Sequence, residues 1–159
     1  DDILTAIRSA REFNLRYTID HCTEGYMIAD ILKEQQVRPV LGPLLADRSK
    51  VELKNQSILA PGILAKQGIP VAIMTDHPCV PQQYLLLCAA VAVREGMPEE
   101  DALRAITIRA AQAVGIEDRV GSLEAGKDAD LVIFSGHPFD YRTKVDITII
   151  NGKVVYRRE

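Results

Sequence analysis

Tryptophan is absent from this 159-residue sequence, and aromatic residues make up only 5% of it. Cysteine is scarce as well: the three residues Cys22, Cys79 and Cys88 are odd in number and show no C-x-x-C spacing. Such a set predicts neither a disulfide framework nor a structural zinc site. We therefore expect a protein of a reducing, cytoplasmic compartment.

The sequence also lacks the features that nucleic acids and membranes recognise. Acidic and basic residues are interleaved along the chain, the net charge is −3, and there is no basic stripe. No run of 18 apolar residues predicts a membrane-spanning helix, and no signal peptide precedes the first predicted element. No glycine-rich loop follows a predicted strand, which argues against a nucleotide-binding domain. We expect neither nucleic acid nor membrane as a partner.

The residues that are present predict a globular α/β protein. Apolar residues make up 47% of the chain and charged residues 26%, a composition typical of soluble domains. Apolar residues at helical spacing predict helices, and the short apolar runs between them predict parallel strands. The helices are expected at 3–13, 23–35 and 51–66, the last with a break left open near Pro61, and the strands at 15–19, 37–41 and 69–74.

In the second half of the chain the predicted helices follow one another directly, and a small group of predicted strands comes after them. Three helices are predicted here. The first covers residues 84–95, the second begins at Pro98, and the third is short and runs from Thr107 to Gly115. A strand is then predicted at 131–134, and residues 145–156 form a predicted hairpin whose Asn-Gly pair suits a type I′ turn. A small β unit after an α/β region is therefore expected.

Two side chains that could bind a metal stand where predicted strands end. His21 follows the strand at 15–19, and Asp76 follows the continuously apolar strand at 69–74. Functional groups gather at the carboxyl ends of parallel strands, so both could point into one site. Taken singly, each has a structural alternative, because a lone histidine is commonly hydrogen-bonded to a neighbour and an aspartate before a turn commonly caps backbone N–H groups.

Four segments carry a resemblance to a known family. Residues 17–22 (YTIDHC) are similar to the sixth barrel strand of the amidohydrolase superfamily, and residues 73–78 (IMTDHP) to its eighth. Residues 121–131 (GSLEAGKDADL) and 149–156 (IINGKVVY) are similar to the β-sandwich annex that both chain ends form in many members. The sequence most resembles imidazolonepropionase-like and related cyclic-amide hydrolases and deaminases, and only their C-terminal part.

The resemblance implies a fold and a division of the chain. The fold would be a partial TIM-like (β/α) barrel made of its last three βα units, followed by extra helices and a small C-terminal β-sandwich annex. Residues 1–116 would form the partial barrel with its helices, and residues 117–159 the annex. A complete (β/α)₈ barrel needs roughly 250 residues, more than this chain has.

The same resemblance implies a metal-dependent hydrolase. Asp76 would bind a divalent metal, zinc above all, and shuttle the proton of the attacking water. His21 would be a metal ligand, as in some members, or a group that supports the ligands or the substrate, as in others. His77 would help bind a small-molecule substrate. Arg48, in the loop after the seventh-strand position, is a further candidate for substrate contact.

Several parts of the family pattern are missing from the sequence. There is no H-x-H pair of the first barrel strand, no lysine or glutamate of the fourth and no histidine of the fifth. A catalytic zinc takes about three protein ligands, of which His21 and Asp76 supply two. Three strands also leave open edges, so we expect pairing with missing barrel strands or self-association into an oligomer.

Two functional interpretations follow from this pattern. In the first, the chain is the C-terminal portion of a metal-dependent amidohydrolase that hydrolyses a non-peptide C–N bond in a cyclic amide or amidine, incomplete and inactive alone. In the second, it is a truncated fragment or interaction module that keeps the scaffold without the chemistry.

Overall fold

The computed structural model describes residues 1–159, and a short parallel ladder of three segments lies at its centre. Strands β1 (Val40–Leu41) and β2 (Ala72–Ile73) pair in parallel, and an isolated parallel bridge joins Ile19 to Pro39. The Val40 amide donates to the Ile19 carbonyl over 2.9 Å, and the Ala72 amide to the Pro39 carbonyl over 3.0 Å. The three segments therefore lie in chain order across the ladder, each next to its neighbour in sequence.

The strands are shorter than the sequence predicts. Of the predicted strand 15–19 only Ile19 forms a bridge, and the other two are reduced to the paired residues of β1 and β2. Ile69 and Val71 are nevertheless fully buried, as the apolar run predicts. The apolar pattern thus predicts burial correctly. The length of a strand also depends on a hydrogen-bonded neighbour, and the two outer segments of the ladder have such a neighbour on one side only.

The second and third predicted helices begin later than the sequence predicts. Helix α1 (Asp2–Glu12) agrees with its pattern, but the predicted helix 23–35 divides into a 3₁₀ turn (Gly25–Ile28) and α2 (Ala29–Glu34). The predicted helix 51–66 divides into a 3₁₀ turn (Val51–Leu53) and α3 (Ala60–Lys66). Pro61 lies in the first turn of α3, where its missing N–H costs no hydrogen bond, so the break comes before Pro61 rather than at it.

Three further helices cover strand β2. A 3₁₀ turn (Gln82–Tyr84) leads into α4 (Leu85–Arg94), which is followed by α5 (Glu99–Ala105) and α6 (Ile108–Val114), and all three helices contact β2. Gly115 ends α6 in the left-handed conformation with φ 75°, as predicted. Thr107 occupies the N-cap position of α6, but its hydroxyl donates back to the Leu103 carbonyl instead of capping the helix.

The core lies between the ladder and these helices. Leu32 and Leu64 from α2 and α3 are fully buried in one core cluster with Val71, and the buried positions of α4 and α5 are alanines and Cys88. Small side chains there let the helices approach the strands closely, which keeps the interior dense around the ladder. The fully buried alanines are Ala89, Ala92, Ala102 and Ala105.

The C-terminal β unit is a single antiparallel sheet. Its strands are β3 (Leu131–Phe134), β4 (Val145–Ile150) and β5 (Lys153–Arg157), in the order β3-β4-β5. Asn151 and Gly152 have φ values of 50° and 73°, both positive as a type I′ turn requires, which confirms the predicted hairpin. The predicted β-sandwich is not complete within the chain, because residues 1–159 provide only this one sheet at the annex.

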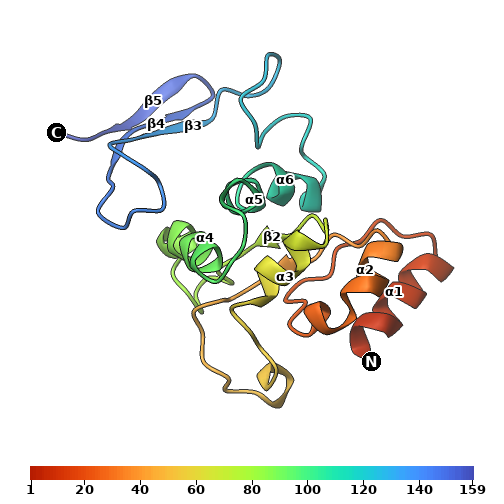
Figure 1. Ribbon diagram of the computed structural model, residues 1–159. Coiled ribbons are helices and arrows are strands. Elements are labelled where there is room, and N and C mark those ends of the chain that lie inside the picture. Colours follow the sequence, from red (N-terminus) through yellow and green to blue (C-terminus); the bar gives the residue numbers. More distant parts are fainter.

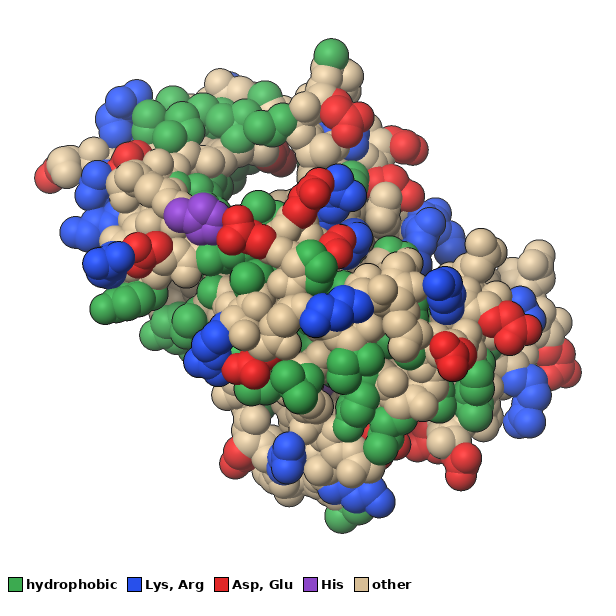
Figure 2. All heavy atoms as spheres, viewed as in Figure 1, with side chains coloured by type: hydrophobic (Ala, Val, Ile, Leu, Met, Phe, Trp, Pro, Cys, Tyr) green, Lys and Arg blue, Asp and Glu red, His purple; other side chains and the backbone are tan.

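The annex sheet stands apart from the helices. Figure 1 shows it at the opposite end of the molecule from α1 and α2. No residue of its three strands is buried, and an apolar cleft of about 900 Å³ separates it from α4, α5 and α6. Figure 2 shows hydrophobic side chains over the annex and the hollow beneath it. One side-chain hydrogen bond crosses to the helices, between His137 Nε2 and Glu99 Oε1 at 3.0 Å.

None of the helices combines the length and the apolar character that crossing a membrane would require. The longest, α1, has 11 residues.

The three cysteines are free and differ in environment. Cys22 and Cys88 are buried, whereas Cys79 is exposed. Burial raises the pKa of the Cys22 thiol to about 12 and also raises that of Cys88. A raised pKa keeps a thiol protonated near neutral pH, and the protonated form is a poor nucleophile.

Thiol labelling of the native protein should therefore modify Cys79 alone. At about pH 8, where an exposed thiol is partly ionised, an aromatic disulfide reagent should react quickly with one group per chain and with all three cysteines after unfolding. The Cys79→Ser variant should lose the fast reaction. Rapid labelling of Cys22 or Cys88 in the folded protein would contradict the burial described here.

Removal of a core side chain should destabilise the protein strongly. Leu64 is 0% exposed, so Leu64→Ala should lower the free energy of unfolding by about 2–5 kcal/mol through lost burial and a residual cavity. The matched control is Leu123→Ala, at a residue 82% exposed, which should change it by less than about 0.5 kcal/mol. Denaturant unfolding measures both, and equal effects would show that the core is placed wrongly.

Candidate functional site

His21 and Asp76 come together at the carboxyl end of the parallel ladder. His21 lies two residues beyond the Ile19 bridge, and Asp76 lies three residues beyond the last residue of β2. His21 Nε2 is 4.0 Å from Asp76 Oδ2, although the two residues come from different segments of the chain. The structure thus brings together the two residues that the sequence predicts as metal ligands.

The backbone at both residues is held in an uncommon conformation. His21 has φ 63° and Asp76 has φ 53°, so the backbone of each lies in the left-handed region that residues other than glycine rarely adopt. Cys22, next to His21, also has a positive φ of 26°. Such conformations cost free energy and are found preferentially at functional sites, where the fold maintains them. Both strand ends therefore turn sharply just where the candidate ligands stand.

The pair is accessible and only loosely joined. The side chains of His21 and Asp76 are 48% and 44% exposed, whereas Thr75, immediately before Asp76, is buried. A separation of 4.0 Å is too long for a hydrogen bond, so each group keeps its capacity to bind a third partner. The Cys22 thiol next to His21 is buried, and this burial raises its pKa to about 12.

The donor set fits part of a zinc site. Zinc takes imidazole nitrogen and carboxylate oxygen at about 2.0–2.2 Å, so two ligands of one tetrahedral ion lie about 3.3–3.6 Å apart. His21 and Asp76 exceed this separation by a few tenths of an ångström, which a small side-chain rotation removes. No group of three or more histidine, cysteine, aspartate or glutamate side chains that could hold a metal ion comes together in the structure.

The two predicted substrate-binding residues differ in position. His77 is exposed directly beside Asp76 and makes no side-chain hydrogen bond within the chain. Arg48 is also exposed, but its guanidinium donates to the Gln56 carbonyl over 2.7 Å and so fastens the long loop after β1. The structure does not bring Arg48 into contact with His21 or Asp76.

Sequence reasoning missed Gln56, which shares a cavity with His21. The cavity measures about 10 Å³ and is also lined by Thr23 and Ser57. Gln56 lies in a polar run without periodicity, Lys54-Asn55-Gln56-Ser57, and no spacing or motif in the sequence distinguishes it from an ordinary loop residue. Only the fold of the loop brings it to the strand ends.

A wider cleft of about 450 Å³ opens on the other side of His21. Its charged lining residues are mainly acidic, with Asp20, Glu24 and Glu52 outweighing Lys54, and residues such as Met27 contribute apolar surface. Glu24 is already engaged, because its Oε1 accepts a hydrogen bond from Asn55 over 2.6 Å. The cleft beside His21 is therefore a negatively charged, partly apolar surface.

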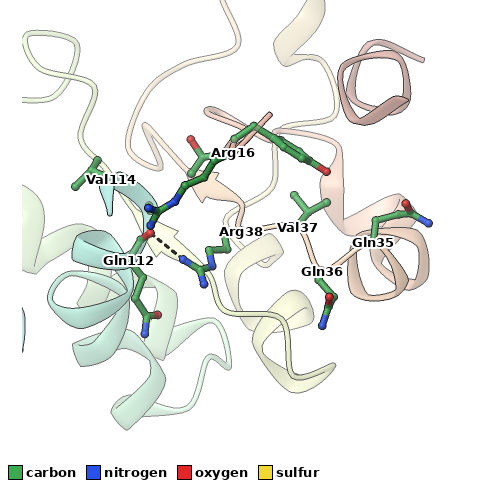
Figure 3. A pocket seen from close by; sticks show the side chains of 10 residues that line it. Arg16, Gln35, Gln36, Val37, Arg38, Gln112 and Val114 are labelled. Carbon is green, nitrogen blue, oxygen red and sulfur yellow. Dashed lines mark hydrogen bonds between the residues drawn. The ribbon is translucent and has the colours of Figure 1, made fainter. Parts of the chain in front are cut away.

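Another cavity, of about 470 Å³, lies near the opposite end of the ladder, and its lining residues have structural roles. Figure 3 shows the Arg16 and Arg38 side chains extending toward the end of α6. Arg38 Nη1 donates to the Gln112 carbonyl over 3.0 Å, and both guanidinium groups approach Glu117 at 3.8–3.9 Å. Cations at a helix C-terminus stabilise its free carbonyls, so these arginines join α6 to the segments that precede Ile19 and Pro39.

Comparison with known sequences shows the family to which the chain belongs. Residues 4–155 match the model of the amidohydrolase family. An imidazolonepropionase from Thermoplasma acidophilum is 34% identical over 137 residues, which cover 81% of this chain and 32% of that protein. A probable imidazolonepropionase from Bos taurus is 35% identical over 104 residues, or 58% of this chain and 24% of its own length. The chain thus spans a third or less of the relatives it matches here.

Solved structures extend the agreement to the fold. An amidohydrolase from Thermotoga maritima is 47% identical and superposes with a TM-score of 0.95 over 99% of this chain and 41% of its own. An adenosine deaminase from Xanthomonas campestris with bound zinc shares the fold at a TM-score of 0.62 over 85% of this chain and 36% of its own, with 24% identity. Because the family model covers nearly the whole sequence, the chain belongs to the amidohydrolase family.

Proposed function

We propose that this chain is the C-terminal portion of a metal-dependent amidohydrolase that hydrolyses a non-peptide C–N bond in a cyclic amide or amidine. The observation that carries the proposal is the 4.0 Å approach of His21 Nε2 to Asp76 Oδ2 at two parallel strand ends. Similarity to imidazolonepropionases supports the substrate class, since the name of those enzymes refers to an imidazolone ring.

In the proposed mechanism Asp76 acts as metal ligand and proton carrier. Its carboxylate accepts a proton from the attacking water and delivers that proton to the leaving nitrogen as the C–N bond breaks, which is general acid–base catalysis. His21 would hold the metal through Nε2 or support the metal ligands. A divalent metal, zinc by the chemistry of these donors, would lower the pKa of a bound water and polarise the substrate carbonyl or amidine.

We further propose that substrate contacts come from the rim of this site. His77 stands beside Asp76 without an internal hydrogen bond, so both of its ring nitrogens remain available to a substrate. Arg48 uses one nitrogen on Gln56 and keeps the other guanidinium donors, which would allow it to contact an anionic substrate group if the loop moves.

The site is proposed to become complete only when other strands join it. The ladder ends on open edges at Ile19 and β2, and the chain supplies two of the about three protein ligands that a catalytic zinc takes. We therefore propose that residues 1–116 form part of a barrel that other strands of the protein or another copy complete. Residues 117–159 form the annex. The three free cysteines support a cytoplasmic setting.

The test is metal content and catalysis in the complete protein. His21→Ala and Asp76→Ala should each lower zinc occupancy in elemental analysis, because each removes a ligand. Asp76→Asn should lower kcat/KM for imidazolonepropionate or a related cyclic amide by about 10²–10⁴-fold, since an amide cannot accept the proton.

His137→Ala is the matched control, because His137 lies in the annex against Glu99 and should affect neither zinc content nor kcat/KM. Full zinc content and full activity in the His21 and Asp76 variants would refute the proposal. A metal-free, inactive complete protein would instead support a scaffold or interaction module that keeps the fold alone.

A further inference from the structure

Gln56 carries a carbonyl oxygen that no protein group satisfies. Its Oε1 atom is buried and accepts no hydrogen bond from the chain. A buried acceptor without a donor loses its hydrogen bonds to water without replacing them, so such atoms are rare in folded proteins and usually have a partner such as water. Gln56 therefore needs a donor that the rest of this chain does not provide directly.

The orientation of the Gln56 amide is fixed. Its Nε2 donates to the Pro43 carbonyl over 2.6 Å. Turning the amide over would bring Oε1 against the Pro43 oxygen, two acceptors in contact, so the oxygen has to be the atom on the other side. The unsatisfied acceptor is thus a consequence of geometry.

The backbone around Gln56 is held equally firmly. The backbone carbonyl of Gln56 accepts a hydrogen bond from the Arg48 guanidinium over 2.7 Å. The backbone N–H of Gln56 donates to the Leu53 carbonyl over 2.9 Å. On the preceding residue, the Asn55 carbonyl accepts from the Tyr26 hydroxyl over 2.9 Å. These bonds tie the loop after β1 to the segment that follows His21, so Gln56 keeps a constant position relative to that histidine.

Gln56 and His21 line one small cavity. Its volume of about 10 Å³ corresponds to roughly one water molecule, and Thr23 and Ser57 offer further polar atoms around it. The Thr23 hydroxyl lies 3.4 Å from the His21 carbonyl and so bonds the backbone rather than the ring. Ser57 Oγ accepts a hydrogen bond from the Leu59 amide over 3.2 Å, whereas Gln56 Oε1 has no hydrogen-bond partner within the chain. The His21 ring is likewise joined to the chain only by its 4.0 Å approach to Asp76.

His21 has a clear need for such a partner. Its Nε2 faces Asp76, which leaves Nδ1 as the nitrogen that must carry the proton if Nε2 is to donate its lone pair. Histidines that bind metals almost always donate the other N–H to a carboxylate, a carbonyl or a water, which fixes the tautomer and the ring orientation.

We propose that Gln56 is a positioning residue for His21: through one water molecule in the shared cavity, Gln56 Oε1 accepts the hydrogen bond of His21 Nδ1–H and keeps Nε2 free toward Asp76. This inference rests on the proposed metal-binding role of His21, but it concerns the ring in the absence of metal as well. The side-chain carbonyl of Gln56 orients the His21 imidazole through the water molecule. Gln56 itself contacts neither metal nor substrate.

The tautomer of His21 can be measured directly in the metal-free complete protein. Long-range ¹H–¹⁵N correlation spectra of ¹⁵N-histidine-labelled protein at about pH 9, where histidine is neutral, distinguish Nδ1–H from Nε2–H. His21→Ala assigns the signal. The wild-type protein should show the Nδ1–H tautomer. Gln56→Met, which keeps the length of the side chain without its acceptor, should shift His21 toward Nε2–H.

Two further variants separate positioning from general disturbance of the loop. Gln56→Glu loses the hydrogen bond to Pro43, as Gln56→Met does, but retains an acceptor oxygen. It should restore the Nδ1–H tautomer if the acceptor, and not the bond to Pro43, sets the tautomer. Gln35→Met makes the same chemical change at the cavity near the opposite end of the ladder and should leave His21 unchanged. Zinc affinity should fall about 10–100-fold in Gln56→Met and stay within twofold of wild type in Gln35→Met.

The outcomes are distinguishable from those of the proposed function. An Nε2–H tautomer in the wild-type protein, or an Nδ1–H tautomer that survives Gln56→Met, overturns the role of Gln56 even if His21 and Asp76 prove essential for catalysis. If Gln56→Met fails to fold, the wild-type tautomer together with the Gln56→Glu spectrum decides the question. The tautomer is measured without metal or turnover, so this test of Gln56 remains decisive even if hydrolysis is never observed.

Discussion

The parallel ladder of Ile19, β1 and β2 is the constraint on which the rest of the structure depends. Its backbone hydrogen bonds align three segments in the same direction, so their carboxyl ends emerge at one edge. Burial of Val71 and Ile73 against the surrounding helices holds the third segment in register, and the chain leaves this buried strand at an exposed Asp76. The approach of Asp76 to His21 is thus a result of backbone pairing, and the side chains themselves contribute little attraction at 4.0 Å.

The two ends of the ladder differ in chemistry. At the carboxyl end His21 and Asp76 are accessible, their backbones are strained, and the neighbouring cleft is acidic. At the other end Arg16 and Arg38 are engaged by Glu117 and by the last turn of α6. The division agrees with the general rule that barrels place chemistry at the carboxyl ends of their strands and stability at the amino ends.

Local patterns predicted those features that are decided locally. The apolar run through Val71 predicted a buried strand, Gly115 a helix end, and Asn151-Gly152 a hairpin, because each depends on residues close in sequence. The length of the strands and the single annex sheet depend on neighbours that a periodic pattern does not specify. The contribution of Gln56 could not be predicted either, since its position relative to His21 arises from bonds to Pro43, Arg48 and Leu53 across a loop without regular structure.

The outer edge of the annex sheet has a bearing on how copies of the protein meet. Strand β5 pairs only with β4, so its far side presents unpaired backbone groups next to exposed Val154, Val155 and Tyr156. Such an edge attracts other strands and promotes aggregation. Lys153 and Arg157 stand at the two ends of β5 and are exposed. Two copies that paired in parallel along β5 would place these positive charges next to one another. The resulting repulsion opposes association at the edge where unpaired backbone groups favour it.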